Sequence, residues 1–235
     1  MKTWKTKSGY QIIQILSGRS NAFLLTNGEN NILIDTGPGF MWRTLDKRLS
    51  RLKVSQIDYL ILSHAHFDHA ANAQKIRDRY GALVIVHRDE MQNLITGDGS
   101  IPHGTNPITR FMVNFLAKKI SPLFRFTPCQ YDILADERLD MHDMGFNAYI
   151  LHTPGHSPGS ISVIVDDKIA LVGDAMFGIF RWSVFPPFAN DVKSLFQSWG
   201  KLLETNCKVF LPSHGSANLR KLVQKNYNER INIMV

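Results

Sequence analysis

The stretch SHAHFDH, residues 63–69, decides the fold expected for this chain. It directly follows the apolar segment IDYLILS, whose composition is typical of a buried strand. An irregular turn after a strand can aim several side chains at one point, and imidazoles with a carboxylate suit zinc, iron or manganese. We therefore interpret four side chains of the stretch as metal ligands: His64, His66, Asp68 and His69. Histidines that stand alone are instead interpreted as surface polar residues: His87, His103, His142 and His152.

Strand and helix patterns alternate on both sides of this cluster. An amphipathic helix is predicted over residues 41–52, and ANAQKIRDRYG predicts a second helix that ends at Gly81. The turn signal Asn27-Gly28 indicates a hairpin within an N-terminal β-meander. The strands predicted for this half cover residues 10–16, 21–27, 30–37, 57–63 and 83–87.

The C-terminal half has the same kind of pattern, and a different segment separates the two halves. Strands are predicted at residues 146–153, 161–167, 168–174 and 207–215, and helices at residues 191–204 and 216–229. Residues 94–128 interrupt this pattern, and we expect them to form a helical cap over the site, inserted into a single domain of residues 1–235. Phe111 and Phe115 of the cap are candidates for the substrate pocket, with a homodimer contact by the same helix as the alternative.

Four ordered motifs resemble those of the metallo-β-lactamase superfamily. SHAHFDH resembles its His-x-His-x-Asp-His signature, and TPGHSPGS at residues 153–160 resembles the segment that supplies a further histidine. GDAMF at residues 173–177 and PSHG at residues 212–215 are the other two motifs. The early IDTG segment, residues 34–37, matches in addition to these four. The resemblance covers nearly the whole chain and implies an α/β (α+β) fold, the four-layer αββα sandwich of the metallo-β-lactamase fold.

The resemblance also implies how the ligands are shared between two divalent cations, zinc by preference, with iron or manganese as alternatives. His64, His66 and His156 would bind the first ion, and Asp68, His69 and His214 the second. Asp174 would bridge them, and Asp68 would also orient the attacking water. Asp35 would orient a metal-binding histidine from outside, with a cap of a turn or strand end as the alternative. Two adjacent cations lower the pKa of a shared water, so that hydroxide is available at neutral pH to attack a carbonyl carbon.

Differences from the motifs of particular branches of the superfamily reduce the number of reactions that we expect. Asp174 stands where penicillin-cleaving members usually carry Cys or Ser, and His66 stands where flavodiiron members carry Glu. GDAMF resembles glyoxalase II, yet the segment after His214 is short for the substrate domain of that family. Lactonases often carry Tyr where Phe177, our third candidate for the substrate pocket, occurs. The expected function is hydrolysis of an ester, thioester or lactone; the alternatives are an iron-dependent persulfide dioxygenase and a phosphodiesterase or nuclease.

Composition agrees with a small-molecule enzyme. The chain is 44% hydrophobic and 20% charged, which is ordinary for a folded domain, and it lacks the apolar runs of a signal peptide or a membrane span. We therefore expect a cytoplasmic protein with no membrane partner. The net charge of +7 would suit nucleic acid, but the basic residues are spread along the chain and no stacking motif accompanies them, so a nucleic-acid partner is disfavoured.

Overall fold

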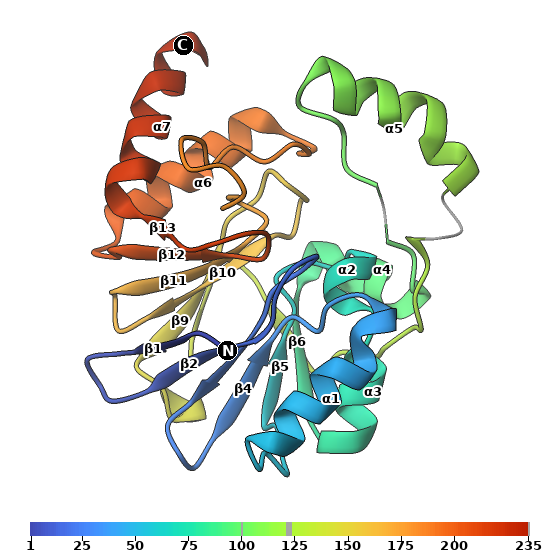
Figure 1. The fold of residues 1–235 in the computed structure, drawn as a ribbon, viewed down its shortest axis with the longest axis vertical. Helices are drawn as coiled ribbons and strands as arrows, with labels where there is room; N and C mark the ends of the chain where they lie inside the picture. Colours follow the sequence, from blue (N-terminus) through green and yellow to red (C-terminus); the bar gives the residue numbers. More distant parts are fainter. Residues whose placement is uncertain (100, 121–123, 235) are drawn as a thin grey trace.

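The protein consists of two β-sheets packed face to face, with helices on both outer faces (Figure 1). The computed structural model describes residues 1–99, 101–120 and 124–234. Within that part of the chain the first sheet has seven strands in the order β1-β2-β3-β4-β5-β6-β7. The second sheet has six strands in the order β13-β12-β11-β10-β9-β8.

The first sheet begins as an antiparallel meander and continues with parallel strands. Its strands are β1 (Thr3–Lys5), β2 (Gln11–Leu16), β3 (Ala22–Thr26), β4 (Asn31–Ile34), β5 (Tyr59–Ile61), β6 (Leu83–His87) and β7 (Ile133–Ala135). Strands β4 to β7 are parallel neighbours, so their carboxyl ends meet at one edge of the sheet. Helices α1 (Trp42–Arg51) and α3 (Ala73–Tyr80) connect β4 to β5 and β5 to β6. As predicted, α3 ends at Gly81, which adopts a left-handed conformation with φ +73°.

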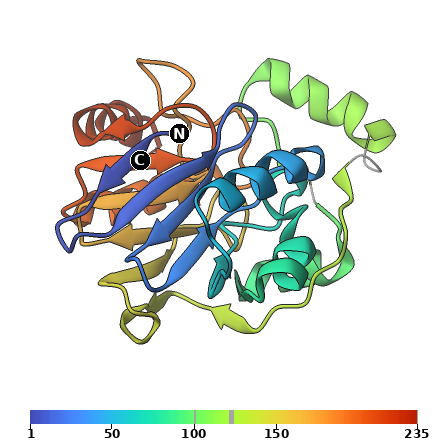
Figure 2. The ribbon, with the colours of Figure 1, turned by 60° about the horizontal axis from the view of Figure 1, so that its bottom comes forward.

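In the second sheet, too, several strands have their carboxyl ends at one edge. Its strands are β8 (Arg138–Asp140), β9 (Ala148–His152), β10 (Ile161–Val165), β11 (Ile169–Gly173), β12 (Val209–Pro212) and β13 (Asn218–Leu219). Strand β10 is antiparallel to both β9 and β11, and β11 is parallel to β12. Strands β9, β11 and β12 therefore all point toward the same edge. Helices α6 (Val192–Glu204) and α7 (Arg220–Met234) cover the outer face of this sheet (Figure 1). Figure 2 shows the two stacked sheets from another side.

Side chains that point alternately to the two faces of each strand explain why the fold has four layers. In β3, Phe23 and Leu25 belong to the core between the sheets, whereas Leu24 belongs to the core under α1 and α3. In β11, Leu171 faces the other sheet and Val172 packs with the residues of α6. Because successive side chains of a strand point to opposite faces, each sheet is apolar on both faces and needs a layer on each side. The expected αββα sandwich is confirmed.

The segment between the two halves is largely helical. It contains α4 (Met91–Thr96) and α5 (Pro107–Ile120), and α5 projects beside the upper end of the sandwich in Figure 1. Residues 100 and 121–123 of the expected cap lie outside the described residues. No helix in the described ranges has the length and apolarity needed to cross a membrane.

Candidate metal centre

All the predicted ligands lie at the ends of strands that point toward a shared edge. His64 and His66 follow β5, and the short helix α2 (Phe67–Ala70) begins directly after them and contains the next two ligands. His156 follows β9, Asp174 follows β11 and His214 follows β12. Since the two sheets face each other, these strand ends bring side chains far apart in the sequence to one point.

The seven side chains form overlapping groups. The ligand atoms of His64, His66 and His156 all lie within 4.8 Å of one another, and so do those of Asp68, His69 and His214. Asp174 connects these groups, because its Oδ2 lies 3.5 Å from Nε2 of His156 and 3.3 Å from Nε2 of His214. These groups contain the seven side chains that the resemblance implied as ligands of two cations.

The donor atoms themselves indicate that a cation fits here. Within the described part of the chain, four buried atoms of the cluster have no hydrogen-bond partner: Nε2 of His64, His66 and His69, and Oδ1 of Asp174. A buried polar atom without a partner costs about 1–3 kcal/mol, so several such atoms facing one space require a ligand. Nitrogen and carboxylate oxygen donors suit zinc and related divalent metals.

For three of the ligand histidines, hydrogen bonds to residues outside the cluster fix which ring nitrogen faces inward. Nδ1 of His69 donates to Oδ2 of Asp35 at 3.0 Å, and Nδ1 of His156 donates to the carbonyl oxygen of Phe188 at 3.0 Å. The Ser63 hydroxyl donates to Oδ2 of Asp35 at 2.8 Å, so its oxygen accepts from Nδ1 of His64 at 3.0 Å. In all three rings Nδ1 is bound to a residue outside the cluster, so Nε2 is the atom that faces the site of a cation.

Asp35 is therefore connected to two ligands at once, directly to His69 and through Ser63 to His64. It also accepts from the Ser63 amide and from the Ser213 hydroxyl, and its side chain is 1% exposed. Asp35 has a left-handed backbone with φ +60°, a conformation that Asp tolerates better than most residues. Asp35 thus occupies the position from which the sequence analysis expected it to orient a histidine.

Gly173 allows the two sheets to approach at the centre. Its φ is +52°, and a Cβ atom built on it would lie 2.8 Å from Cβ of Ser63. A side chain at this position would push the end of β11 away from the residue that precedes His64. Glycine here therefore brings Asp174 within reach of the histidines.

Burial and the neighbouring ligand side chains shift the pKa values of the histidines in the cluster. Burial, and then the neighbouring His156, lower the pKa of His66 to about 3. Burial acts in the same direction on His69 and His214, but the nearby carboxylates, mainly those of Asp68 and Asp174, outweigh it and raise their pKa values to about 9 and about 11. Those two protons are positive charges placed between carboxylates, and bound cations would take their place.

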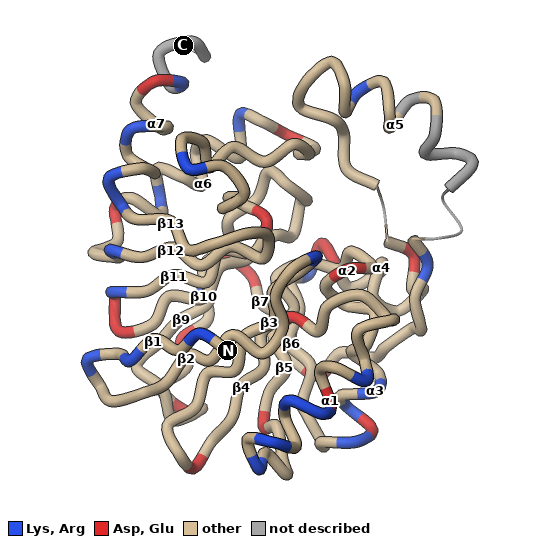
Figure 3. The backbone as a smooth tube through the Cα atoms, viewed as in Figure 1, with Lys and Arg blue, Asp and Glu red and all other residues tan. Residues whose placement is uncertain are grey.

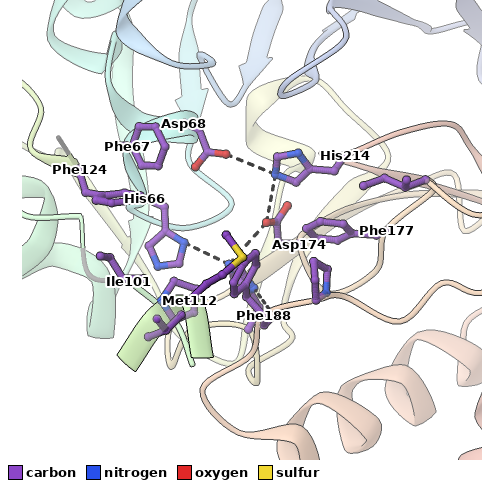
Figure 4. A pocket seen from close by; sticks show the side chains of 15 residues that line it. His66, Phe67, Asp68, Ile101, Met112, Phe124, Asp174, Phe177, Phe188 and His214 are labelled. Atoms are coloured by element: carbon purple, nitrogen blue, oxygen red, sulfur yellow. Dashed lines mark hydrogen bonds and ion pairs between the residues drawn. The ribbon is translucent and has the colours of Figure 1, made fainter. Parts of the chain in front are cut away.

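A cavity of about 440 Å³ opens in front of this cluster (Figure 4). Phe177 lines it and stacks on the His214 ring, with 4.6 Å between the ring centroids. Phe111 and Phe115 do not line it, and that expectation is wrong: they contact each other on one side of α5 and are 61% and 65% exposed. Met112, at a different angle around the same helix, lines the cavity instead.

His87 and His152 also differ from the expectation that they are isolated surface residues. Their rings stack 4.0 Å apart, and His87 is only 5% exposed. Nδ1 of His87 accepts from the Asp89 amide, and Nε2 of His152 donates to the carbonyl oxygen of Pro158. The pair packs together because β6 and β9 end at the same edge, which the sequence spacing does not reveal. His103 and His142 are exposed, as expected.

Glu90 is a positioning residue that the sequence analysis missed. It lies in the short 3-10 helix Arg88–Glu90 after β6, and its side chain is fully buried. Oε2 accepts from the amide of Ala65, between His64 and His66, while Oε1 accepts from the amide of Gly159. One carboxylate thereby ties together the two loops that carry the first ligand group. In the sequence, an acidic residue just after a strand looks like an ordinary helix cap. Only the burial of Glu90 in the structure distinguishes it from one.

We expect Glu90→Gln to weaken metal binding by about 10–100-fold, the usual range for groups that orient ligands. The amide nitrogen cannot accept a hydrogen bond, so one of the two loop amides loses its partner. Competition with a chelator measures the affinity. Asp89→Asn is the matched control, because the neighbouring Asp89 side chain is 53% exposed. Equal affinities in the two variants would show that Glu90 does not position the ligands.

Comparison with known sequences identifies relatives over most of the chain. Residues 17–214 match the family model described as the metallo-beta-lactamase superfamily. A probable metallo-hydrolase of Methanocaldococcus jannaschii is 30% identical over 202 residues, which is 83% of this chain and 87% of that protein. A hydroxyacylglutathione hydrolase of Haemophilus influenzae is 28% identical over 216 residues, 88% of this chain and 90% of its own length.

Comparison with solved structures agrees on the fold. An archaeal metallo-beta-lactamase superfamily protein from Sulfolobus tokodaii superposes with a TM-score of 0.66 at 21% identity. The match covers 94% of this chain and 86% of the archaeal protein. At this identity the likeness concerns the arrangement of strands and helices.

Proposed function

The chain belongs to the metallo-β-lactamase superfamily and is a metal-dependent hydrolase, and from that premise we propose that it holds two divalent cations and cleaves a carbonyl substrate: an ester, a thioester or a lactone. The observation that carries the proposal is the set of unpartnered Nε2 and Oδ1 atoms that face one another between the two ligand groups. Zinc is the metal that this donor set favours, with iron and manganese as alternatives.

Two cations held here would supply hydroxide at neutral pH and polarise the carbonyl oxygen. His64, His66 and His156 would hold one, and Asp68, His69 and His214 the other, with Asp174 shared. The side chains around the site orient the ligand rings. Asp35 and Ser63 bind Nδ1 of His69 and His64 respectively, so that the Nε2 atom of each ring is the one directed toward a bound cation.

Asp68 differs from Asp174 in exposure and therefore in its proposed role. Its side chain is 22% exposed and lines the cavity, whereas Asp174 is 4% exposed. Oδ2 of Asp68 lies 3.4 Å from Nε2 of His214, and Oδ1 lies 3.6 Å from Nε2 of His69. A carboxylate at the wall of the cavity can accept a hydrogen bond from the attacking water and orient it toward the substrate.

Charge distribution favours a carbonyl substrate over a phosphodiester. Lys and Arg residues lie along α1, α3 and α7 and near the β1–β2 turn (Figure 3). Among the described residues that line the cavity there is no Lys or Arg. A nuclease of this net charge would be expected to gather positive charge around the reacting phosphate.

Two other activities remain candidates for specific reasons. The Haemophilus influenzae relative favours a hydroxyacylglutathione as the thioester. A persulfide dioxygenase would need one iron held by two histidines and an aspartate, and the two complete ligand groups favour the hydrolase over it.

A substrate panel tests the proposal with one zinc-loaded preparation. It contains simple acyl thioesters, S-lactoylglutathione, lactones, bis-p-nitrophenyl phosphate and single-stranded RNA, with an iron-loaded sample and a persulfide in an oxygen electrode alongside. We expect the highest kcat/KM on a carbonyl substrate. A phosphodiester rate that exceeds every acyl rate by orders of magnitude, or oxygen consumption with the persulfide and no acyl hydrolysis, would contradict it.

A further inference from the structure

We propose that the cavity in front of the metal centre binds an uncharged, apolar acyl group, so that the substrate is an acyl ester, thioester or lactone whose acyl portion carries no ionised group. The inference rests on the proposed hydrolase function and adds the chemical class of the substrate. It depends on the side chains that line the cavity.

The cavity is polar only where it meets the metal centre. Its described polar lining consists of five of the candidate metal ligands: His66, Asp68, His156, Asp174 and His214. All its other described lining residues are apolar, and they come from several separate segments (Figure 4). Phe67 of α2 and Phe124 form one aromatic wall, with their rings edge to face at 4.7 Å. Met112 and Val113 of α5 line the cavity as well.

The volume suits a small molecule rather than a polymer. About 440 Å³ lies within the range of ordinary ligand pockets, roughly 300–1,000 Å³. A group that enters such a pocket exchanges part of its contact with water for contact with the lining side chains. An acyl chain whose carbonyl lies at the metal centre would extend along Phe67, Phe124 and Met112.

An ionised acyl group would lose its hydration without compensation. A carboxylate moved into apolar surroundings needs a cation or several hydrogen-bond donors, and the described walls of the cavity provide no Lys, Arg, Asn, Gln, Ser or Thr. The same reasoning disfavours substrates with a carboxylate next to the reacting group. A glutathione portion, which is also charged, could be accommodated only outside the cavity.

The mouth of the cavity is apolar too. Met112 is 46% exposed and Ile179 is 57% exposed, and both line the cavity. A chain too long for the interior would therefore continue over apolar side chains. Phe111, one residue before Met112, lies outside the cavity and is exposed to solvent. This pair provides two neighbouring positions on α5, one inside and one outside.

The test compares acyl groups that differ only in length or terminal charge. The zinc-loaded protein is assayed with p-nitrophenyl esters from acetyl to decanoyl and with the adipoyl ester, which has the six carbons of hexanoyl but ends in a carboxylate. We expect kcat/KM to rise about four-fold per methylene until the cavity is filled, the factor given by burying one methylene. We expect the adipoyl ester to be at least about 100-fold worse than the hexanoyl ester.

Two variants test whether the cavity causes the dependence of kcat/KM on acyl length and charge. Met112→Lys keeps a side chain of similar length but puts a cation in the wall, so it should flatten the dependence on chain length and reduce the preference for hexanoyl over adipoyl at least about ten-fold. Phe111→Lys adds the same charge one residue away and should leave both ratios as in the parent. Binding of 2-alkanones from 2-pentanone to 2-undecanone, which cannot be hydrolysed, provides a measurement independent of turnover.

The outcomes separate the two proposals. Turnover that is independent of chain length, or that favours the adipoyl ester, would overturn the apolar acyl pocket while leaving the hydrolase intact. Equal effects of the two lysine variants would also overturn it. If no carbonyl substrate is turned over, the proposed function fails; then 2-alkanone binding that tightens with length would support the pocket, and absence of such binding would overturn it.

Discussion

Replacing Asp174 by alanine is expected to lower kcat/KM on every substrate by on the order of 10³-fold and to reduce the number of tightly bound metal ions. Asp174 lies between both ligand groups, with Oδ2 within 3.5 Å of Nε2 of both His156 and His214. The flanking histidines would keep their positions through bonds that do not involve Asp174, such as that from His156 to Phe188. The variant therefore removes charge from the centre while leaving the surrounding rings in place.

His142→Ala is the control for this variant. His142 is exposed and lies in a short 3-10 helix, His142–Met144, away from the cavity. His87→Ala would be a poor control, because His87 is buried against His152 and packs close to Gly159, one of the residues that Glu90 binds. A loss in His142→Ala comparable to that in Asp174→Ala would remove the basis for assigning the bridge to Asp174.

Asp35→Asn is expected to weaken metal binding by about 10–100-fold and to lower kcat/KM with it. Asparagine tolerates the left-handed backbone that Asp35 adopts, so the main-chain path should be preserved. Its side chain offers one oxygen in place of two, whereas Asp35 accepts four hydrogen bonds, including those from Ser63 and His69. At least one of these donors would lose its acceptor, which loosens the hold of Asp35 on His69 or on the Ser63 segment that precedes His64.

Asp166→Asn distinguishes orientation of the ligands from general stability. Asp166 is also a mostly buried aspartate with a positive φ, +52°, and it accepts hydrogen bonds from Ser8 and Asn147 at a distance from the metal centre. Both variants should lower the midpoint of thermal unfolding of the metal-free protein. Only Asp35→Asn should also lower metal affinity in a chelator competition. Similar affinities in the two variants would show that Asp35 has a structural role alone.

The sequence predicted the sandwich because its long strands have clear patterns. Segments such as ISVIVDD and KIALVGD are apolar on both faces, as expected of strands covered by a layer on each side. The edge strands β7 and β8 escaped prediction because each has only three residues, too few for any periodicity to appear. Residues 218–219 pair with β12, so the last helix begins at Arg220 rather than at residue 216.

The convergence of the ligands was also predictable, because strand direction places them at one edge. What the sequence could not reveal were contacts between residues on different strands. The stacking of His87 on His152 and the two bonds of Glu90 depend on the distance between the ends of β6 and β9. The error on Phe111 and Phe115 has a related cause: the sequence identified an apolar helix, but not which of its sides faces the cavity.

The most direct test of the account is to titrate metal-free protein with zinc while measuring both bound metal and hydrolysis of an acyl ester. Because both three-residue groups and the shared Asp174 are intact, we expect tight binding to saturate at two ions per chain. Full hydrolytic activity should appear only as the second ion binds. Saturation at one ion, with no further gain in activity when more zinc is added, would contradict a dinuclear hydrolase.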